Sequence, residues 1–357
     1  MKKVVVGMSG GVDSSVTALL LKNQGYEVIG ITMNIWQRKR TDIVCEKACC
    51  AVDAVSDARR VCEKLDIPYY AMNFKDMFKT EVIDYFVEEY INGKTPNPCI
   101  ACNKYLKFDK LLEKAKTLFD AEYIATGHYA RIKKDEKTNR YYLSESATMA
   151  KDQTYALYNL SQDQLSHILF PLGDYDKDTV RQIARENNLV NANKHDSQEI
   201  CFVEDNDYAK FIETEYGYVS KPGDFVDKEG QILGKHKGII HYTIGQRRGL
   251  GLSFKQPMYV IKIDTVKNQV ILGFLEDLYK DELICEKLNF MPFEKLEEPL
   301  KVQAKIRYSA KKVEAKITPL EDEKVLVKFK EPQKSITPGQ AVVFYDDEVI
   351  LGGGTIV

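Results

Sequence analysis

A loop rich in glycine and serine follows the first apolar run of the chain. The run is Val4 to Val6, and the loop consists of Gly7, Met8, Ser9, Gly10, Gly11, Val12, Asp13 and Ser14. Gly10 and Gly11 have no Cβ atom, so backbone N–H groups there can approach an oxyanion closely. The serine hydroxyls and the free N–H groups at the start of the next helix attract the same anion. The loop therefore predicts a phosphate-binding site, in which Asp13 either holds Mg²⁺ or orders the loop.

Three cysteines in polar segments offer a second kind of chemistry. Cys99 and Cys102 form a Cys-x-x-Cys motif that follows two prolines and precedes an expected helix, and Cys201 lies in a separate polar segment. The N-terminus of a helix stabilises a thiolate, and the thiolate is the nucleophilic form of cysteine. Reactive thiols combined with a phosphate-binding loop favour sulfur transfer.

The elements that must position these residues alternate between strand and helix over the first half of the chain. We expect strands at residues 3–8, 27–33, 69–73 and 122–126, and helices at residues 14–24, 52–65, 80–90 and 104–119. Such alternation is typical of a parallel sheet that is covered on both faces and binds ligands at the carboxyl ends of its strands. The glycine-rich loop and the segment Thr126-Gly127-His128 both lie at such ends.

The second half of the chain has a different pattern. Further helices are expected at residues 177–187 and 206–216, and short β-rich runs then follow at residues 239–242, 258–264 and 270–272. These runs, separated by turn residues, are typical of small β modules, with a break near residues 276–282. We therefore predict an α/β domain with a doubly wound parallel sheet at residues 1–205, then two small, mainly β domains. The first of these is a central β-rich domain at residues 206–277, and the second is a C-terminal β-barrel at residues 278–357.

Composition excludes several classes of protein. The 357 residues are 44% hydrophobic, which is enough for two or three cores. No run of 18 apolar residues predicts a membrane span, and the N-terminus lacks the features of a signal peptide. We therefore expect a cytoplasmic protein with no membrane partner, whose eight cysteines are thiols, metal ligands or redox catalysts rather than structural disulfides.

The charge pattern permits a local surface for nucleic acid. The net charge of −2 argues against indiscriminate binding, but residues 301–334 contain ten lysines and arginines against five acidic residues. Such a segment is most often a solvated β surface. Arg307 and Tyr308 within it combine a guanidinium fork with an aromatic ring, a pair that suits an unstacked nucleotide.

Seven motifs taken together resemble one known family. They are SGGVDS, TPNPCIACNKYLKF, TGHYAR, KDQTYAL, DSQEICF, HYTIGQRRGLGL and KIRYS, which begin at residues 9, 95, 126, 151, 196, 241 and 305. In order and approximate spacing they resemble the tRNA-specific 2-thiouridylases of the PP-loop ATP pyrophosphatase superfamily. The resemblance implies ATP-dependent 2-thiolation of the wobble uridine in tRNAs for Lys, Glu and Gln.

The same resemblance implies roles for individual residues. ATP would be held by the loop from Gly7 to Ser14, by Met33 and by Gly127, with Mg²⁺ neutralising the pyrophosphate that is released. Cys102 would be the nucleophile, and Cys201 would carry a persulfide and pair with Cys102. The residues matching RNA-contacting positions are Asn97, Pro98 and Cys99 for the target base, and His128, Lys151, Asp152, Gln153, Arg307, Tyr308 and Gln340 for the rest of the tRNA. The family also implies a sulfur donor, a cysteine desulfurase or sulfide, acting directly or through carriers.

Two sulfur routes remain open at this point. Many relatives carry aspartate where this chain has Cys99, and thiolates at Cys99, Cys102 and Cys201 could hold a [4Fe-4S] cluster that delivers sulfide from its open iron. The rival route is a persulfide on Cys201 with Cys102 as its partner. Both routes use the same three cysteines.

The other cysteines have simpler explanations. Cys45, Cys49 and Cys50 form a cluster without the fourth ligand that tetrahedral zinc requires. Cys62 and Cys285 are expected to be small, buried hydrophobic side chains.

Two other functions fit part of the sequence. A PP-loop amide ligase acting on a small metabolite would use the same loop, but it would leave the cysteines idle and would need a source of ammonia. A non-catalytic RNA-binding or cluster-carrying protein would not need an intact phosphate-binding loop. Sulfur transfer to tRNA accounts for more of the motifs than either.

Overall fold

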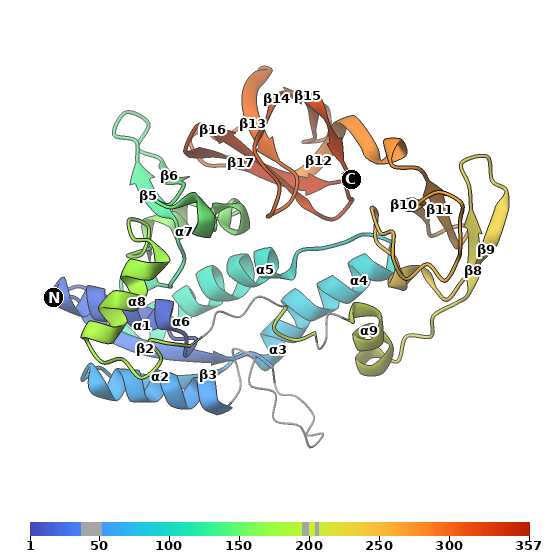
Figure 1. The fold of residues 1–357 in the computed structure, drawn as a ribbon. Helices are drawn as coiled ribbons and strands as arrows, with labels where there is room; N and C mark the ends of the chain where they lie inside the picture. Colours follow the sequence, from blue (N-terminus) through green and yellow to red (C-terminus); the bar gives the residue numbers. More distant parts are fainter. Residues whose placement is uncertain (37–51, 195–199, 204–206) are drawn as a thin grey trace.

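The computed structural model describes residues 1–36, 52–194, 200–203 and 207–357. Cys45, Cys49 and Cys50, the polar segment 195–199 before Cys201, and Asn206 lie outside the described residues. None of the described helices is long and apolar enough to cross a membrane. The described chain contains three sheets. Figure 1 shows the strands β1 to β3 at the lower left of the view, β8 to β11 at the right and β12 to β17 at the top.

The first sheet has five parallel strands in the order β3-β2-β1-β4-β7. These strands are β1 (Lys3–Gly7), β2 (Glu27–Asn34), β3 (Tyr69–Asn73), β4 (Tyr123–Ala125) and β7 (Ile168–Leu169). Val4 and Val6 of the central strand belong to one hydrophobic cluster, and Val5 belongs to another. Because successive side chains of a strand point to opposite faces, the sheet separates two cores.

Helices cover both faces of this sheet, as the sequence predicts (Figure 1). The cluster around Val4 and Val6 contains residues of α1 (Val12–Asn23), α2 (Val52–Lys64) and α8 (Lys177–Glu186). The cluster around Val5 contains residues of two long helical rods, described next. The predicted α/β domain with a doubly wound parallel sheet is therefore confirmed.

The two rods begin earlier than predicted. The first consists of α3 (Lys75–Phe78), the π-helix η1 (Lys79–Asp84) and α4 (Tyr85–Ile91), and the second of α5 (Pro98–Ala101), the π-helix η2 (Cys102–Lys110) and α6 (Leu111–Phe119). Asn97 caps the second rod, since its side-chain oxygen accepts a hydrogen bond from the Cys99 N–H at 3.1 Å, and Pro98 takes the first helical position. Cys99 and Cys102 therefore lie inside the helix, and the expectation that they precede it is wrong.

The chain between β4 and α8 contains elements that the sequence did not reveal. They are β5 (Arg131–Lys134), β6 (Tyr141–Ser144), the 3₁₀ turns η3 (Met149–Lys151) and η4 (Thr154–Leu157), α7 (Gln162–Ser166) and the edge strand β7 of the first sheet. β5 and β6 are antiparallel partners of only four residues each. A strand as short and charged as β5, which reads Arg-Ile-Lys-Lys, carries too little apolar pattern to be recognised.

A second, four-stranded sheet follows α9 (Tyr208–Tyr216). Its order is β10-β11-β8-β9, with strands β8 (Gly223–Val226), β9 (Ile232–His236), β10 (Tyr259–Asp264) and β11 (Gln269–Gly273). The β-rich run expected at residues 239–242 is instead the 3₁₀ turn η5 (Ile239–His241), so that expectation is wrong. Ile239 and Ile240 are both buried, whereas consecutive residues of a strand would face opposite sides.

The third sheet contains a closed barrel. After the 3₁₀ turn η6 (Glu276–Leu278), six strands run in the order β12-β15-β14-β13-β16-β17, and β12 also pairs with β17. They are β12 (Tyr279–Phe290), β13 (Leu300–Lys305), β14 (Val313–Pro319), β15 (Val325–Lys334), β16 (Ala341–Asp346) and β17 (Val349–Ile356). The predicted mainly β second half, ending in a barrel, is therefore confirmed.

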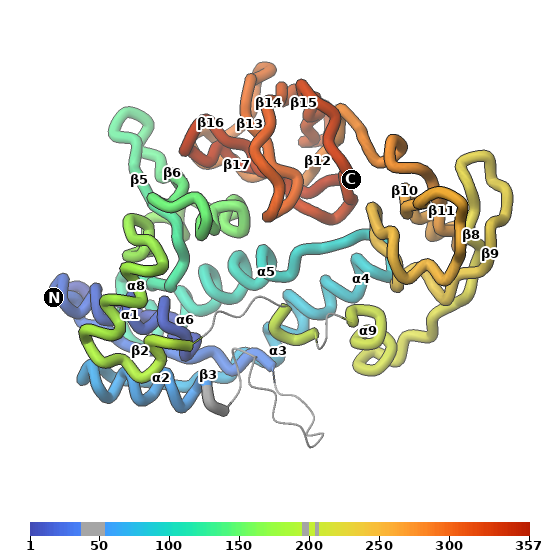
Figure 2. The backbone as a smooth tube through the Cα atoms, in the orientation of Figure 1, coloured from blue at the N-terminus to red at the C-terminus, as the bar shows by residue number. Residues whose placement is uncertain are grey.

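The β5–β6 hairpin connects the first domain to this barrel. Ser144 of β6 pairs with Val349 of β17, and Leu143 pairs with Ile350. Figure 2 shows the hairpin beside β17, although the two segments are far apart in the sequence. One continuous sheet therefore runs from the first domain into the barrel.

Candidate active site

Two glycine segments meet where the order of the first sheet reverses. That reversal lies between β1 and β4, and ligands of doubly wound sheets bind outside the strand ends at such a point. Gly7 ends β1, and Gly127 follows the end of β4. A Cβ atom on Gly127 would lie 2.8 Å from the Cβ of Asp13, so the two segments are in close contact. The structure thus brings together both parts of the predicted nucleotide site.

The backbone of the loop requires glycine at its tightest point. Gly10 has a φ of +72°, and a Cβ atom there would lie 2.3 Å from the carbonyl oxygen of Ala54. The Asn191 side chain, which comes from the segment after α8, donates to the Gly10 carbonyl at 3.1 Å and to the Ser15 hydroxyl at 2.8 Å. Asn191 was not predicted, because nothing in the local sequence links it to the loop.

The loop hydroxyls form a network with the backbone. The Ser14 hydroxyl accepts from the Ser9 N–H at 3.2 Å and donates to the Gly11 carbonyl at 3.0 Å. The two hydroxyls of Ser9 and Ser14 are also 3.2 Å apart. Met8, which follows β1, donates its N–H to the Ile31 carbonyl of β2 at 2.8 Å. Hydroxyl donors are therefore held at the mouth of α1, where an anion would bind.

Asp13 is held by two donors from distant parts of the chain. The Lys177 ammonium, on the first residue of α8, lies 2.8 Å from both carboxylate oxygens, and the Tyr129 hydroxyl donates to Oδ1 at 2.8 Å. These contacts order the loop, and binding of Mg²⁺ by Asp13 stays a prediction. Lys177 was not predicted from the sequence, although the loop lacks the lysine of a Walker A motif and so requires a cation from elsewhere.

Two further predicted residues lie at the same edge of the sheet. Met33 is half-buried near the end of β2, opposite Met72 of β3. The His128 Nδ1 lies 2.6 Å from the Thr126 hydroxyl, and its ring packs against Phe108 and Phe170. This burial lowers the pKa of His128 well below its usual range, so the imidazole is neutral and offers phosphate no positive charge.

The three candidate thiols have different surroundings. Cys99 is exposed on the first turn of α5, whereas Cys102 is buried at the start of η2. Cys201 is half-buried and packs against the same hydrophobic cluster that contains Cys102. The next residue, Phe202, anchors this segment by packing edge-on against Phe86 with the ring centroids 5.2 Å apart.

Metal ligation by these residues is not supported by their arrangement. Among the residues that the structure describes, which include all three thiols, no group of three or more His, Cys, Asp or Glu could hold a metal ion.

Cys62 and Cys285 are fully buried, as predicted, and burial raises the pKa of each thiol to about 12. Neither is therefore a reactive thiolate.

Asp152, a predicted tRNA contact, directs its carboxylate into the protein. The side chain accepts hydrogen bonds from the Ser146 N–H at 3.1 Å and from the Thr154 hydroxyl at 2.6 Å. Burial raises the pKa of this carboxyl. The backbone carbonyl of Asp152 accepts from the Tyr308 hydroxyl at 3.2 Å. The carboxylate thus fixes the local chain, and the backbone contacts the barrel.

Other predicted RNA contacts lie where the barrel meets the first domain. Arg307 and Tyr308 are exposed after β13, and the half-buried Lys151 belongs to η3. Gln340 donates to the Thr95 carbonyl at 2.8 Å, just before the Asn97–Cys99 segment. The predicted contacts on the barrel and on the first domain are therefore brought together by the fold.

The basic segment of the barrel is partly neutralised. Lys328 lies 2.7 Å from Asp281, and Lys330 lies 2.6 Å from Glu314. Lys312 pairs with the buried Glu145 of the first domain at 2.9 Å. The excess of positive charge counted from the sequence therefore overstates the charge available to a phosphate backbone.

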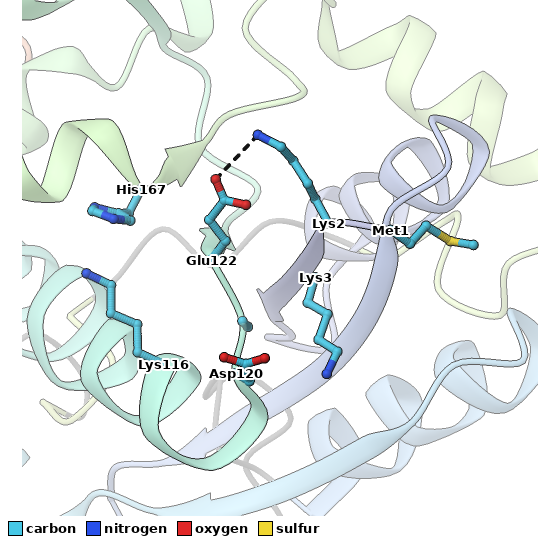
Figure 3. Close-up of a pocket in the computed structure, with 8 residues that line it drawn as sticks. Met1, Lys2, Lys3, Lys116, Asp120, Glu122 and His167 are labelled. Carbon is cyan, nitrogen blue, oxygen red and sulfur yellow. Dashed lines mark hydrogen bonds and ion pairs between the residues drawn. The ribbon is translucent and has the colours of Figure 1, made fainter.

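Two cavities flank these elements. One, of about 490 Å³, lies at the amino ends of β1 and β4, where Lys2 and Glu122 form an ion pair at 3.3 Å (Figure 3). It is at the opposite edge of the sheet from the glycine-rich loop. The other, of about 300 Å³, is lined by Asn97, Lys104 and Asn289, among others, between the second helical rod and the barrel. Asn97 thus lines a cavity together with Ile100 and Ala101, which lie between the two cysteines of the Cys-x-x-Cys motif.

Comparisons with known proteins cover nearly the whole chain. Family models described as a tRNA methyl transferase HUP domain, a tRNA methyl transferase PRC-barrel domain and an aminomethyltransferase beta-barrel domain match residues 2–205, 209–274 and 280–356. A solved complex of a 4-thiouridine synthetase with RNA and bound ATP is 16% identical, with a TM-score of 0.34, and the match covers 56% of this chain and 45% of that chain. The family assignment does not depend on this distant structure.

Two relatives are much more similar. The tRNA-specific 2-thiouridylase MnmA 1 of a Thermoanaerobacter species is 59% identical over 99% of this chain and 97% of its own length. The tRNA-specific 2-thiouridylase MnmA of Clostridioides difficile is 56% identical over 99% of this chain and 98% of its own length. The resemblance found from the motifs is confirmed, and the chain belongs to the tRNA-specific 2-thiouridylase family.

Proposed function

We propose that this protein is an ATP-dependent tRNA-uridine 2-sulfurtransferase, which replaces the C2 oxygen of the wobble uridine in tRNAs for Lys, Glu and Gln with sulfur. Family membership along nearly the whole chain is the observation that carries the proposal. The loop at the switch point and the Cys-x-x-Cys turn offer the two chemistries that this reaction needs. Because tRNA and ATP are cytoplasmic molecules, we expect the enzyme to act in the cytoplasm.

The first step that we propose is adenylation of the base. The C2 oxygen of uracil attacks the α-phosphorus of ATP, the bond between the α-phosphorus and the bridging oxygen breaks, and pyrophosphate leaves. The N–H and hydroxyl groups of residues 7–14 bind the phosphates, and Met33 and Gly127 complete the nucleotide site. Mg²⁺ bound with the nucleotide neutralises the charge on the leaving pyrophosphate.

The second step that we propose is sulfur transfer through a persulfide on Cys201. Its terminal sulfur attacks C2, and AMP leaves with the former C2 oxygen. The Cys102 thiolate then attacks the Cys201 sulfur, which breaks the S–S bond and releases the 2-thiolated base. A disulfide between Cys102 and Cys201 remains, and a cellular thiol reductant supplies two electrons to open it.

The alternative route through a [4Fe-4S] cluster does not fit this arrangement of cysteines. Cys99 is exposed and Cys102 is buried, and the described residues provide no group of ligands for a metal ion. We expect protein purified without oxygen to be iron-free and fully active with a persulfide donor. Iron bound in stoichiometric amounts, with activity that follows the iron content, would instead establish the cluster route.

We propose a division of labour along the chain. Residues 1–205 carry the adenylation and sulfur chemistry, residues 206–277 form a central domain, and residues 278–357 form a barrel that helps to bind tRNA. Asn97, Pro98 and Cys99 contact the target base. The remaining tRNA contacts are His128, Lys151, Gln153, Arg307, Tyr308 and Gln340, and Asp152 orders the 151–153 segment from its buried side. Sulfur reaches Cys201 from a cysteine desulfurase, which hands on a persulfide sulfur directly or through carriers, or from sulfide. In the second case sulfide attacks the Cys102–Cys201 disulfide left by the preceding turnover, which leaves a persulfide on Cys201 and a thiolate on Cys102.

Pyrophosphate release tests the choice between tRNA and a small metabolite. We expect release to require tRNA with a wobble uridine and to be absent with tRNA that carries cytidine there. Cys201→Ala is expected to retain this release but to incorporate no sulfur, whereas Cys285→Ala, which removes a thiol from the barrel core, retains both steps. Pyrophosphate release with a metabolite and ammonia, and without tRNA, would favour the amide ligase. Equal loss of both steps in Cys201→Ala would contradict the role of Cys201.

A further inference from the structure

Tyr129 connects two parts of the proposed site. Its side chain is only 2% exposed, and its hydroxyl donates to Oδ1 of Asp13 in the nucleotide loop at 2.8 Å. Its backbone makes two hydrogen bonds with Gln153, one from the Tyr129 N–H to Oε1 at 3.0 Å and one from the Gln153 N–H to the Tyr129 carbonyl at 3.0 Å. The side chain of Tyr129 thus contacts the loop, while its backbone contacts the segment proposed to bind tRNA.

The Gln153 segment is held firmly on its other side. The Asp152 carboxylate accepts hydrogen bonds from Ser146 and Thr154, and the Asp152 carbonyl accepts from the Tyr308 hydroxyl of the barrel. A segment fixed at this many points moves as a unit. A change at the surface formed by residues 151–153 and Tyr308 therefore reaches the backbone of Tyr129 through two hydrogen bonds.

The position of the Asp13 carboxylate matters for the nucleotide. Asp13 lies in the first turn of α1, where the helix N-terminus attracts phosphate, and an unpaired carboxylate there would repel a triphosphate. Lys177 and Tyr129 together hold this carboxylate. Lys177 contacts both carboxylate oxygens, and Tyr129 adds a second donor to Oδ1.

From these contacts we infer that Tyr129 is a positioning residue that couples tRNA docking to the nucleotide loop through Gln153 and Asp13. The inference rests on the proposed function and deepens it. Docked tRNA holds the 151–153 segment, Gln153 then holds the backbone of residue 129, and the Tyr129 hydroxyl holds Asp13 in the orientation that admits ATP. Because such coupling is reciprocal, bound ATP increases the affinity for tRNA by the same factor.

The test measures ATP affinity with and without tRNA. The probe is the α,β-methylene analogue of ATP with Mg²⁺, because its α–β linkage cannot be cleaved, and the tRNA is an unmodified transcript with a wobble uridine. In the natural protein, we expect saturating tRNA to increase the affinity for the analogue by about fivefold or more. In Tyr129→Phe, which removes only the hydroxyl, we expect this factor to fall to nearly one.

Variants of Gln153 separate coupling from folding. Gln153→Ala removes the acceptor for the Tyr129 N–H and should lose the coupling, whereas Gln153→Glu keeps an acceptor oxygen and should retain it. The double variant Tyr129→Phe/Gln153→Ala should lose no more than either single variant, because both act on one connection. Tyr123→Phe is the matched control, since this β4 hydroxyl contacts Lys2 at the other edge of the sheet. Its coupling factor should be unchanged.

The possible outcomes are distinct. A coupling factor of one in the natural protein, or an undiminished factor in Tyr129→Phe, would overturn the inference. If Tyr129→Phe weakened binding of the ATP analogue equally with and without tRNA, the inference would also be overturned. The hydroxyl would then be part of the nucleotide site and would not couple it to tRNA. Failure of the natural protein to thiolate tRNA at all would instead reject the proposed function.

Discussion

Two aspartates that the sequence placed at functional positions have opposite surroundings. The Asp13 carboxylate lies at the switch point of the sheet, held by Lys177 and Tyr129. The Asp152 carboxylate is buried and satisfied by groups of its own segment. At the scale of residues, these contacts assign Asp13 to the predicted nucleotide site and Asp152 to ordering its own segment of the chain.

Substitution of Asp13 tests the first of these roles. We expect Asp13→Ala to abolish tRNA-dependent pyrophosphate release, because the carboxylate that orders the loop is gone. Asp13→Asn keeps an acceptor for Tyr129 but leaves Lys177 without a counter-ion, and release should fall about 100-fold. Binding of tRNA, measured by filter retention, should change little in either variant. Undiminished pyrophosphate release in Asp13→Ala would remove this residue from the site.

His128 predicts a dependence of stability on pH. Burial against Phe108 and Phe170, and secondarily the Lys107 charge, lowers the pKa of His128 well below 6.5 in the folded state. The unfolded chain therefore binds the proton first, so the contribution to stability is complete above about pH 6.5 and is lost as the pH falls below it. Between pH 7.5 and pH 5.5, the free energy of unfolding measured with urea should fall by about 1 kcal/mol because of this group.

The matched variant isolates that effect from the other histidines. Burial also lowers the pKa of His236 and His241, so the natural protein alone does not identify His128. His128→Gln should be less stable at pH 7.5, and its stability should decline less toward pH 5.5. If the free energy of unfolding declined equally in the natural protein and in His128→Gln, His128 would not remain neutral in the folded state.

At the scale of elements, apolar pattern decided what could be predicted. The sequence located β1 to β4 and α1 and α2 to within about two residues. β1 and β2 carry clear runs of buried side chains, whereas β3 has none and was located by its alternation with the neighbouring helices. It missed the β5–β6 hairpin, which is short and charged, and mistook η5 for a strand. Lys177 and Tyr129 were missed as partners of Asp13 because long-range contacts leave no local pattern in a single sequence.

The cap of the second helical rod gives a prediction at this scale. Asn97→Ala removes the side-chain acceptor of the Cys99 N–H and should lower the free energy of unfolding by about 1 kcal/mol. Asn97→Asp retains a capping oxygen and should be nearly as stable as the natural protein. Urea unfolding of the three proteins at pH 7.5 checks this. Equal stability of the alanine and aspartate variants would show that the cap does not hold the Cys99 turn.

At the scale of the whole molecule, the barrel is built into the first domain. β6 pairs with β17, the Tyr155 hydroxyl donates to the Ala341 carbonyl at 2.8 Å, and Asn289 donates to the Tyr158 carbonyl at 2.8 Å. The barrel and the first domain therefore present their predicted RNA contacts in a fixed relation. A long RNA can then be held at both while one base reaches the chemistry.

Salt dependence tests which charges meet the RNA. Arg307→Ala should weaken tRNA binding and make the slope of log affinity against log salt shallower by about one, because one phosphate contact is lost. Lys330→Ala is the control, since Lys330 is paired with Glu314 at 2.6 Å, and it should leave the slope unchanged. An unaltered slope in Arg307→Ala would remove Arg307 from the phosphate contacts.

The most direct test of the whole account is mass spectrometry of tRNA after reaction. Unmodified tRNA for Glu, Lys or Gln is incubated with the protein, ATP, Mg²⁺ and a persulfide or sulfide source, and the wobble nucleoside is then analysed. We predict that oxygen is replaced by sulfur at C2 of that uridine, that ATP yields AMP and pyrophosphate, and that Cys201→Ala gives no sulfur. Wobble uridine that keeps its oxygen while the protein consumes ATP would contradict sulfur transfer as the function of this molecule.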